Sequence, residues 1–330
     1  MTPELILFVI TIVFCYMYAF VGGFTDAANA IATAIGSRAI SPLAAVLMAG
    51  ILETVGALTG TAVALTIGKG IVSLELITII TVLSALLGTM AWSMTTYYYG
   101  IPVSETHGLI GAILGAGIAS GGMGVIVWSG LVKTLIAIVV SPLLGVFGGM
   151  FLMWLVYRLF AKKPAHTMTS IFKNFQRLSS AFIAFSHGQN DAQKPMGVLI
   201  MVLALHYGWK NPEVPLWVIL SVGATAGIGV AYGGWRIIKT LGMRIAPLSV
   251  EQGFAAEMSA AGTLQIASYF GIPVSTTHTI TSAIVGSGIA KRISSVRWGI
   301  AFEIALSWIA TLPATIALGW VFAKLLGLVF

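Results

Sequence analysis

Apolar segments of about 20 residues or longer follow one another along almost the whole of this 330-residue chain. An α-helix of about 20 apolar residues can cross the hydrocarbon core of a bilayer, and it satisfies its own backbone hydrogen bonds there. Only 8% of the residues are charged, against about 25% in an ordinary soluble domain, so a water-soluble fold would expose one large apolar surface. The segments do not alternate with polar residues as the strands of a membrane β-barrel do. We therefore predict an all-α polytopic membrane protein, in contact with the lipid bilayer.

The remaining composition excludes two further classes of protein. The single cysteine, Cys15, rules out a disulfide framework and a zinc site built from several thiolates. The net charge of +7 could suit nucleic acid, but the basic residues lie mostly between the apolar segments, where they orient a chain in the membrane. We expect no nucleic-acid partner.

The N-terminus carries Glu4 and no basic region, which is not typical of a cleaved signal peptide.

The chain contains an internal repeat. Residues 100–119 read GIPVSETHGLIGAILGAGIA and residues 271–290 read GIPVSTTHTITSAIVGSGIA, with 13 of 20 positions identical at an offset of 171. Asp26 in GFTDAANAIA pairs with Asp191 in GQNDAQKPMG at an offset of 165. Ordered matches of this length indicate a duplication. We predict a first transmembrane repeat over 1–161, a cytoplasmic connecting loop over 162–177 and a second transmembrane repeat over 178–330.

Each half contains about five candidate membrane spans. They cover residues 4–35, 41–67, 73–98, 101–120 and 125–157 in the first half, and 179–205, 214–235, 247–270, 272–290 and 298–328 in the second. When the central loop is placed in the cytoplasm, the inner loops together with Arg158 hold 12 of the 17 basic residues. This distribution satisfies the positive-inside rule and predicts that both termini lie outside.

The turns that follow the two repeated PVS segments differ in charge. The first, SGGMGV, is uncharged, whereas its counterpart KRISSVR has three basic residues. Turns of opposite charge character favour opposite sides of the membrane, so we predict two inverted-topology repeats. Each of the segments 101–120 and 272–290 is either a broken helix or a re-entrant hairpin. If they re-enter, the spans that follow could each split, at Pro142 and at Pro313.

Only two of the ten acidic residues are aspartates, Asp26 and Asp191, and both lie in apolar surroundings. An ionised aspartate at bilayer depth costs about 2.5–3.5 kcal/mol on insertion scales, which favours a functional role. Carboxylate, amide and hydroxyl oxygens together suit a hard cation such as Na⁺, and the carboxylates could instead accept a proton. The competing interpretation is a buried ion pair or a polar contact between helices. The neutral oxygen donors near the two aspartates are Thr25, Asn29, Gln189 and Asn190.

The paired PVS segments predict an anion site. Proline before a short helix helps to define its start, and the free N–H groups of the first turn attract an oxyanion such as phosphate. The alternative is two ordinary helices with serine caps. Glu105 stands where the second segment has a threonine, so the site is not fully symmetric. His107 and His278 have either a direct role or a purely structural one. The candidate phosphate-binding residues are Ser104, Thr106, Gln189, Ser275, Thr276 and Thr277.

Two further acids lie within spans among small residues, Glu53 and Glu257. We interpret them as residues that relay protons or bind a cation, with an anchoring role in the fold as the alternative. Lys194, three residues after Asp191, could either neutralise that aspartate or attract the anion. His187, four residues before Asp191, shares its helix face.

The motifs GFTDAANAIAT, HGQNDAQK and the paired PVSETH and PVSTTH resemble those of the inorganic phosphate transporter family, over essentially the whole chain. The resemblance implies a secondary phosphate symporter driven by Na⁺ or H⁺, with inverted repeats, external termini and a homodimer. It assigns transport roles to the Ser and Thr residues of both PVS segments, and His187 matches a position that modulates transport. Its other transport residues fall on Asp26, Asn29, Glu53, Asn190, Asp191 and Glu257.

The sequence departs from the family pattern at Thr25, because the first signature commonly has asparagine before the aspartate. This change removes an amide ligand from the first cation site. If the coupling ion is Na⁺, we expect Asp26, Asn29, Asn190 and Asp191 to bind it. We expect a multi-pass protein of the cytoplasmic membrane that is not an enzyme and has no cofactor. The alternative function is a permease for sulfate or another oxyanion.

Overall fold

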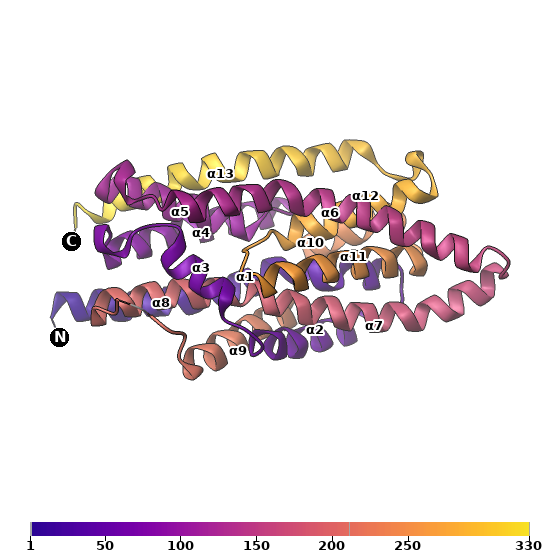
Figure 1. The fold of residues 1–330 in the computed structure, drawn as a ribbon, viewed down its shortest axis with the longest axis horizontal. Coiled ribbons are helices and arrows are strands. Elements are labelled where there is room, and N and C mark those ends of the chain that lie inside the picture. The colour runs from indigo at the N-terminus through magenta and orange to yellow at the C-terminus, as the bar shows by residue number, and fades with distance from the viewer. Residues whose placement is uncertain (1, 211, 330) are drawn as a thin grey trace.

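The computed structural model describes residues 2–210 and 212–329, and those residues contain helices and no strand (Figure 1). The all-α part of the prediction is confirmed. The α-helices are Pro3–Gly36 (α1), Pro42–Ala57 (α2), Ala62–Gly70 (α3), Ile79–Tyr99 (α4), Glu105–Gly121 (α5), Trp128–Phe160 (α6), Ala165–Asp191 (α7), Gln193–Tyr207 (α8), Leu216–Tyr232 (α9), Trp235–Lys239 (α10), Val250–Tyr269 (α11), Thr276–Lys291 (α12) and Trp298–Leu326 (α13). Short 3₁₀ turns cover Leu74–Leu76, Met123–Val125 and Ile293–Ser295, and a π-helical turn covers Thr240–Arg244.

Four of the described helices, α1, α4, α6 and α13, are long and apolar enough to cross a membrane, and the number rises to six if each of two bent helix pairs is one span. This is fewer than the roughly ten crossings that the sequence predicted. The bent pairs are α2 with α3, at 70°, and α9 with α10 and its π-helical extension, at 57°. A contact from the other half of the chain supports the first break, because the Gln193 side-chain oxygen accepts hydrogen bonds from the backbone N–H groups of Val63 and Ala64. Those N–H groups have no partner inside the new helix.

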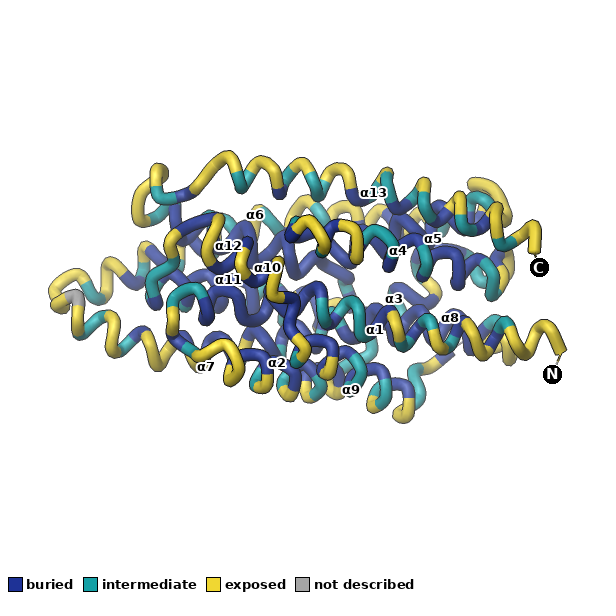
Figure 2. Tube along the Cα trace, turned by 180° about the vertical axis from the view of Figure 1, so that it is seen from behind, coloured by how far each residue is buried: buried dark blue, intermediate teal, exposed yellow. Residues whose placement is uncertain are grey.

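The PVS segments precede helices of about half the length of the molecule. Figures 1 and 2 show α4 and α5 in the half that carries the two termini, and α11 and α12 in the opposite half. Each pair is a hairpin whose turn contains a glycine with positive φ, Gly100 at 68° and Gly271 at 65°, a conformation that glycine adopts without strain. The segments 101–120 and 272–290 thus form the second arms of helical hairpins. The splits that re-entry could have brought are absent, since α6 and α13 continue through Pro142 and Pro313.

The polar segment 162–177 is helical over most of its length, because α7 begins at Ala165. The prediction of a loop across the whole segment is therefore wrong. Its apolar side packs into the protein, where Phe172 is buried against Phe160 and Phe254, while its polar side faces outward. Figure 1 shows the short turn between α6 and α7 at the end of the molecule opposite to both termini.

Two apolar clusters form most of the core. One lies towards the termini and includes Leu86, Leu109 and Leu199; the other lies in the opposite half and includes Ile238 and Ile284. Along α1 the first cluster ends at Ala19 and the second begins at Ala27. The polar residues that begin at Asp26 therefore lie between two apolar layers.

The hairpin helices pack on the long helices of the other half of the sequence: α5 lies along α13, and α12 lies along α6. Both contacts depend on glycine. A methyl group on Gly115 would meet the carbonyl oxygen of Ile316, and one on Gly286, its counterpart in the repeat, would meet the carbonyl oxygen of Val146. Small residues let helix backbones approach closely in membranes.

We expect Gly115→Ala to lower the free energy of unfolding in detergent by about 1–3 kcal/mol, the usual cost of overpacking. The matched control is Gly262→Ala in α11, because a methyl group at that position would have no described atom within 4 Å apart from its chain neighbours and its own helix backbone. In the control the higher helix propensity of alanine leaves stability unchanged or raises it by up to about 1 kcal/mol. Equal stability of the two variants in a thermal unfolding assay would contradict the packing argument.

Candidate functional site

The starts of α5 and α12 are built in the same way. The Ser104 hydroxyl oxygen accepts a hydrogen bond from the His107 backbone N–H at 3.1 Å, and the Ser275 hydroxyl accepts one from the His278 N–H at 3.1 Å. Both serines are therefore N-caps, which both interpretations of the PVS segments expected. The two imidazole rings touch edge to face with centroids 4.4 Å apart, so the helix starts meet inside the protein.

Two reciprocal hydrogen bonds join these segments. The Thr106 hydroxyl donates to the backbone oxygen of Val274 at 2.8 Å, and the Thr277 hydroxyl donates to the backbone oxygen of Val103 at 2.9 Å. Each residue of the first bond lies 171 positions from its counterpart in the second, which is the offset of the sequence repeat. The repeat in the sequence is thus a pairwise contact in the structure.

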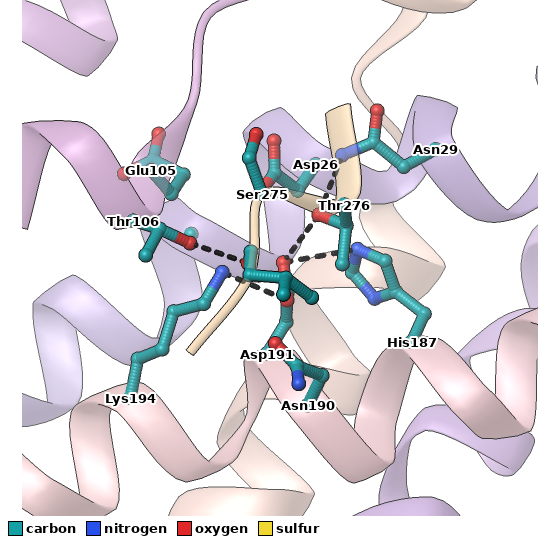
Figure 3. Close-up of polar contacts among 12 residues, drawn as sticks. Asp26, Asn29, Glu105, Thr106, His187, Asn190, Asp191, Lys194, Ser275 and Thr276 are labelled. Carbon is teal, nitrogen blue, oxygen red and sulfur yellow. Dashed lines mark hydrogen bonds and ion pairs between the residues drawn. The ribbon is translucent and has the colours of Figure 1, made fainter. Parts of the chain in front are cut away.

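Asp191, at the end of α7, has three partners beside this crossing (Figure 3). Its Oδ1 lies 2.7 Å from the Lys194 ammonium. Its Oδ2 accepts a hydrogen bond from the Thr276 hydroxyl at 2.8 Å and lies 3.3 Å from Nε2 of His187. All of these side chains are largely buried. The charge of Asp191 is therefore balanced by groups of its own half of the chain.

Asp26 on α1 is much less firmly bound. The Thr277 hydroxyl lies 3.4 Å from Oδ1 of Asp26 but closer to the Val103 backbone oxygen, at 2.9 Å. Asn29 donates to the hydroxyls of Thr276, at 3.2 Å, and Thr277, at 2.9 Å. Its buried side-chain oxygen accepts a hydrogen bond from none of the described residues. The Asp26 carboxylate and two threonine hydroxyls thus lie on this side of the site, with the amide nitrogen of Asn29 directed at the hydroxyls (Figure 3). Carboxylate and hydroxyl oxygens suit a hard cation.

Two glutamates join the site from other helices. Glu53 of α2 lies 2.7 Å from Nδ1 of His187, so the two ring nitrogens of that histidine face two different carboxylates. Both nitrogens can donate only when the imidazole is protonated. Glu105 at the start of α5 accepts hydrogen bonds from Thr25 and Ser93, both at 2.9 Å. Neither glutamate is exposed.

A small cavity of about 20 Å³ lies among these groups and is lined by polar and apolar side chains. By this measure a cavity of about 10–15 Å³ is the minimum for one water molecule. The space therefore admits a water molecule or a small ion. Ligand atoms of Asp26, His187 and Asp191 lie within 4.8 Å of one another at its wall. The lining residues are Tyr18, Ala19, Gly22, Gly23, Asp26, Glu53, Glu105, His187, Asp191, Lys194, Pro195 and Ala226.

Comparison with known proteins settles the family of this chain. The sequence profile of the phosphate transporter family matches residues 22–319. The chain belongs to the phosphate transporter family. It is 43% identical to a probable low-affinity inorganic phosphate transporter of Rhizobium meliloti, over 90% of each chain. It is 37% identical to one of Bacillus subtilis, over 99% of each chain. These relatives are named as transporters, so the expectation that the chain is not an enzyme is confirmed.

The fold of this family member also matches a solved structure, that of "the sodium-dependent phosphate transporter". The TM-score is 0.88 with 27% sequence identity, and the match covers 98% of this chain and 100% of the other. The resemblance read from the sequence motifs is therefore confirmed. The chain is a multi-pass membrane protein.

Not every candidate residue of this phosphate transporter family member reaches the cavity. Glu257 on α11 lies in a separate buried cluster. Its carboxylate accepts hydrogen bonds from four neighbouring side chains, at 2.6 Å from Thr33, at 3.2 Å from Gln176 and at 2.9 Å from Ser180, with a further one from Ser179. These donors satisfy the carboxylate in full, an arrangement that fits the anchoring interpretation.

Asn190 and Gln189 also lie outside the cavity lining. The Asn190 amide donates to the Ser268 hydroxyl at 3.0 Å and towards the Ile272 backbone oxygen at 3.4 Å, so it contacts the α11–α12 hairpin. The buried side-chain oxygen of Gln189 has no hydrogen-bond partner among the described residues.

Tyr18, Pro195 and Ser93 were not among the predicted site residues. Tyr18 is 2% exposed and lines the cavity beside Asp26. The sequence contains a signal for Tyr18. It precedes Asp26 by eight residues, or about two helical turns, so the two side chains share a face of the helix. Ser93 carries no such signal, because its contact with Glu105 depends on the turn of the α4–α5 hairpin.

Proposed function

We propose that this chain is a secondary active transporter that moves inorganic phosphate across the cytoplasmic membrane together with Na⁺ or H⁺. The observation that carries the proposal is the crossing of the two PVS segments, with reciprocal hydrogen bonds, directly beside Asp26 and Asp191. It brings two helix N-termini, which attract an oxyanion, next to the carboxylates that bind a coupling cation or proton. The names of the relatives and of the structural neighbour support phosphate as the substrate.

The coupling follows from electrostatics. An unpaired carboxylate in a low-dielectric interior is costly, and so is a phosphate dianion. A cation held by Asp26 and Asn29, or a proton on Asp26, removes one negative charge before the anion enters. Hydroxyls of the PVS segments then hydrogen-bond the phosphate, with the N–H groups of the first helical turns directed at it. Binding each substrate therefore favours binding of the other.

Alternating access is supported by the way that the two halves repeat their packing. The contacts of α4 with α1, and of α5 and α4 with α13, have counterparts in those of α11 with α7, and of α12 and α11 with α6. We interpret residues 1–161 and 178–330 as inverted repeats that exchange conformations around a fixed central site. The central site of this exchange includes the small cavity among the acidic groups.

The orientation that we propose puts the termini outside and the α6–α7 turn in the cytoplasm. The basic residues of 158–177 flank that turn, at the end opposite to both termini (Figure 1), in accord with the positive-inside rule. A homodimer belongs to the proposal because the family resemblance implies it.

The test is uptake of labelled phosphate into proteoliposomes with the Na⁺ gradient and the pH gradient imposed separately. We expect phosphate to accumulate against its own gradient when one of the two is imposed, and only to equilibrate when neither is. Protein-free vesicles are the control. The proposal would be contradicted if neither gradient drove accumulation of phosphate. It would also be contradicted if sulfate were taken up as well as phosphate when the two compete.

A further inference from the structure

The two halves of the site differ by one charge at equivalent positions. The offset of 165 that pairs Asp26 with Asp191 also pairs Asn29 with Lys194. Both residues follow their aspartate by three positions. Asp26 and Asn29 lie one turn apart on α1, whereas Asp191 ends α7 and Lys194 lies in the first turn of α8. One half thus has a neutral oxygen donor where the other half has an ammonium group on a flexible stem.

Lys194 occupies the position of a bound cation. Its ammonium lies 2.7 Å from Oδ1 of Asp191, and the side chain is 2% exposed. Figure 3 shows it directed at Asp191, with the Thr276 hydroxyl on the other carboxylate oxygen. An ion at such a distance from a carboxylate, in a buried site, is held strongly because little water screens the attraction.

Asp26 has no such partner. It forms an ion pair with none of the basic side chains that the structure describes. The side-chain oxygen of Asn29 is buried and accepts no hydrogen bond from the described residues. The carboxylate of the first half therefore has no ion pair among the described residues, whereas the carboxylate of the second half is already paired with an ammonium group.

From this asymmetry we infer that Lys194 is a tethered cation that replaces a mobile coupling cation in the second half of the site. The chain takes up its coupling cation or proton at the Asp26 side only, and Lys194 prevents Na⁺ from binding beside Asp191. This inference rests on the proposed function, because it concerns the number of cations that accompany each phosphate. It assigns Lys194 a role in ion stoichiometry, distinct from a role as a ligand of phosphate.

The test is Lys194→Asn, which gives the second half the same residue that the first half has. The Na⁺ and pH gradients across proteoliposomes are set, and the membrane potential at which the net flux of labelled phosphate is zero is measured. This potential gives the number of ions coupled to each phosphate. We expect Lys194→Asn to couple one more Na⁺ per phosphate than the wild type does. Lys194→Arg keeps the tethered charge and is expected to retain the wild-type number. An unchanged number in Lys194→Asn, with only a higher phosphate KM, would overturn the inference.

A second measurement does not require transport. Purified wild type, Lys194→Asn and Lys194→Arg are unfolded thermally in detergent at increasing NaCl, with choline chloride keeping the ionic strength constant. A site that binds Na⁺ stabilises the folded state in proportion to its occupancy, so the midpoint of Lys194→Asn should rise with Na⁺ more than those of the other two. Equal shifts in all three would overturn the inference. If the wild type fails to accumulate phosphate, the proposed function fails, and this measurement still decides the role of Lys194.

Discussion

Replacement of Asp26 by asparagine is expected to weaken cation-driven uptake of phosphate strongly. The substitution keeps the shape of the side chain but removes the carboxylate that has no basic partner among the described residues. Interactions with a charged group are worth about 1.5–3 kcal/mol, so cation affinity, and uptake at a limiting cation concentration, should fall about 10–100-fold. The measurement is the initial rate of labelled phosphate uptake in proteoliposomes under the driving gradient.

The matched control for this variant is Glu303→Gln, which neutralises an exposed acid on α13. It should leave uptake close to the wild-type rate. Asp26→Asn should still insert and elute from a sizing column as the wild type does, because Asp26 makes a single long hydrogen bond with the residues that the structure describes. Uptake by Asp26→Asn at the rate of the control would show that the carboxylate has no part in coupling.

Replacement of Glu53 by alanine is expected to lower the free energy of unfolding by about 3–5 kcal/mol, the usual cost of removing one partner of a buried ion pair. Glu53 and His187 are each 1% exposed, with 2.7 Å between the carboxylate and the ring. The variant leaves the histidine with Asp191 as its remaining acidic neighbour at 3.3 Å. Thermal or denaturant unfolding in detergent measures the loss.

The double variant Glu53→Ala/His187→Ala tests the cause of that loss. Because it removes both charges, it should be less destabilised than the sum of the two single variants. Glu213→Gln, at an exposed acid, is the control and should change stability by less than about 0.5 kcal/mol. Strict additivity of the two single substitutions would mean that the pair does not stabilise the fold.

The predictions that held rest on patterns of neighbouring residues. The low charge and the long apolar segments indicated helices in a membrane, and the PVS motifs indicated helix starts, which the caps at Ser104 and Ser275 match. The pairing of Asp26 with Asp191 came from the internal repeat, and the structure brings ligand atoms of the two residues to within 4.8 Å of each other.

Where sequence reasoning failed, the deciding contact came from elsewhere in the chain. The break between α2 and α3 involves hydrogen bonds to Gln193, a residue of the other half. The helix through 165–177 depends on the burial of Phe172 against Phe254. No window of local sequence contains either contact, and so periodicity and charge alone predicted a continuous span and a loop.

By itself, the sequence determined the class of the protein, its duplication, its family and most of the polar residues that meet at its centre. Only the tertiary structure decided which of these residues touch. It chose between the two roles open to Lys194 by pairing it with Asp191, left Asp26 without an ion pair among the described residues, and placed Glu257 in a cluster of its own. The physical reason is that composition, periodicity and repeats depend on neighbours along the chain, whereas most contacts of the buried acids are with residues 80 to 250 positions away.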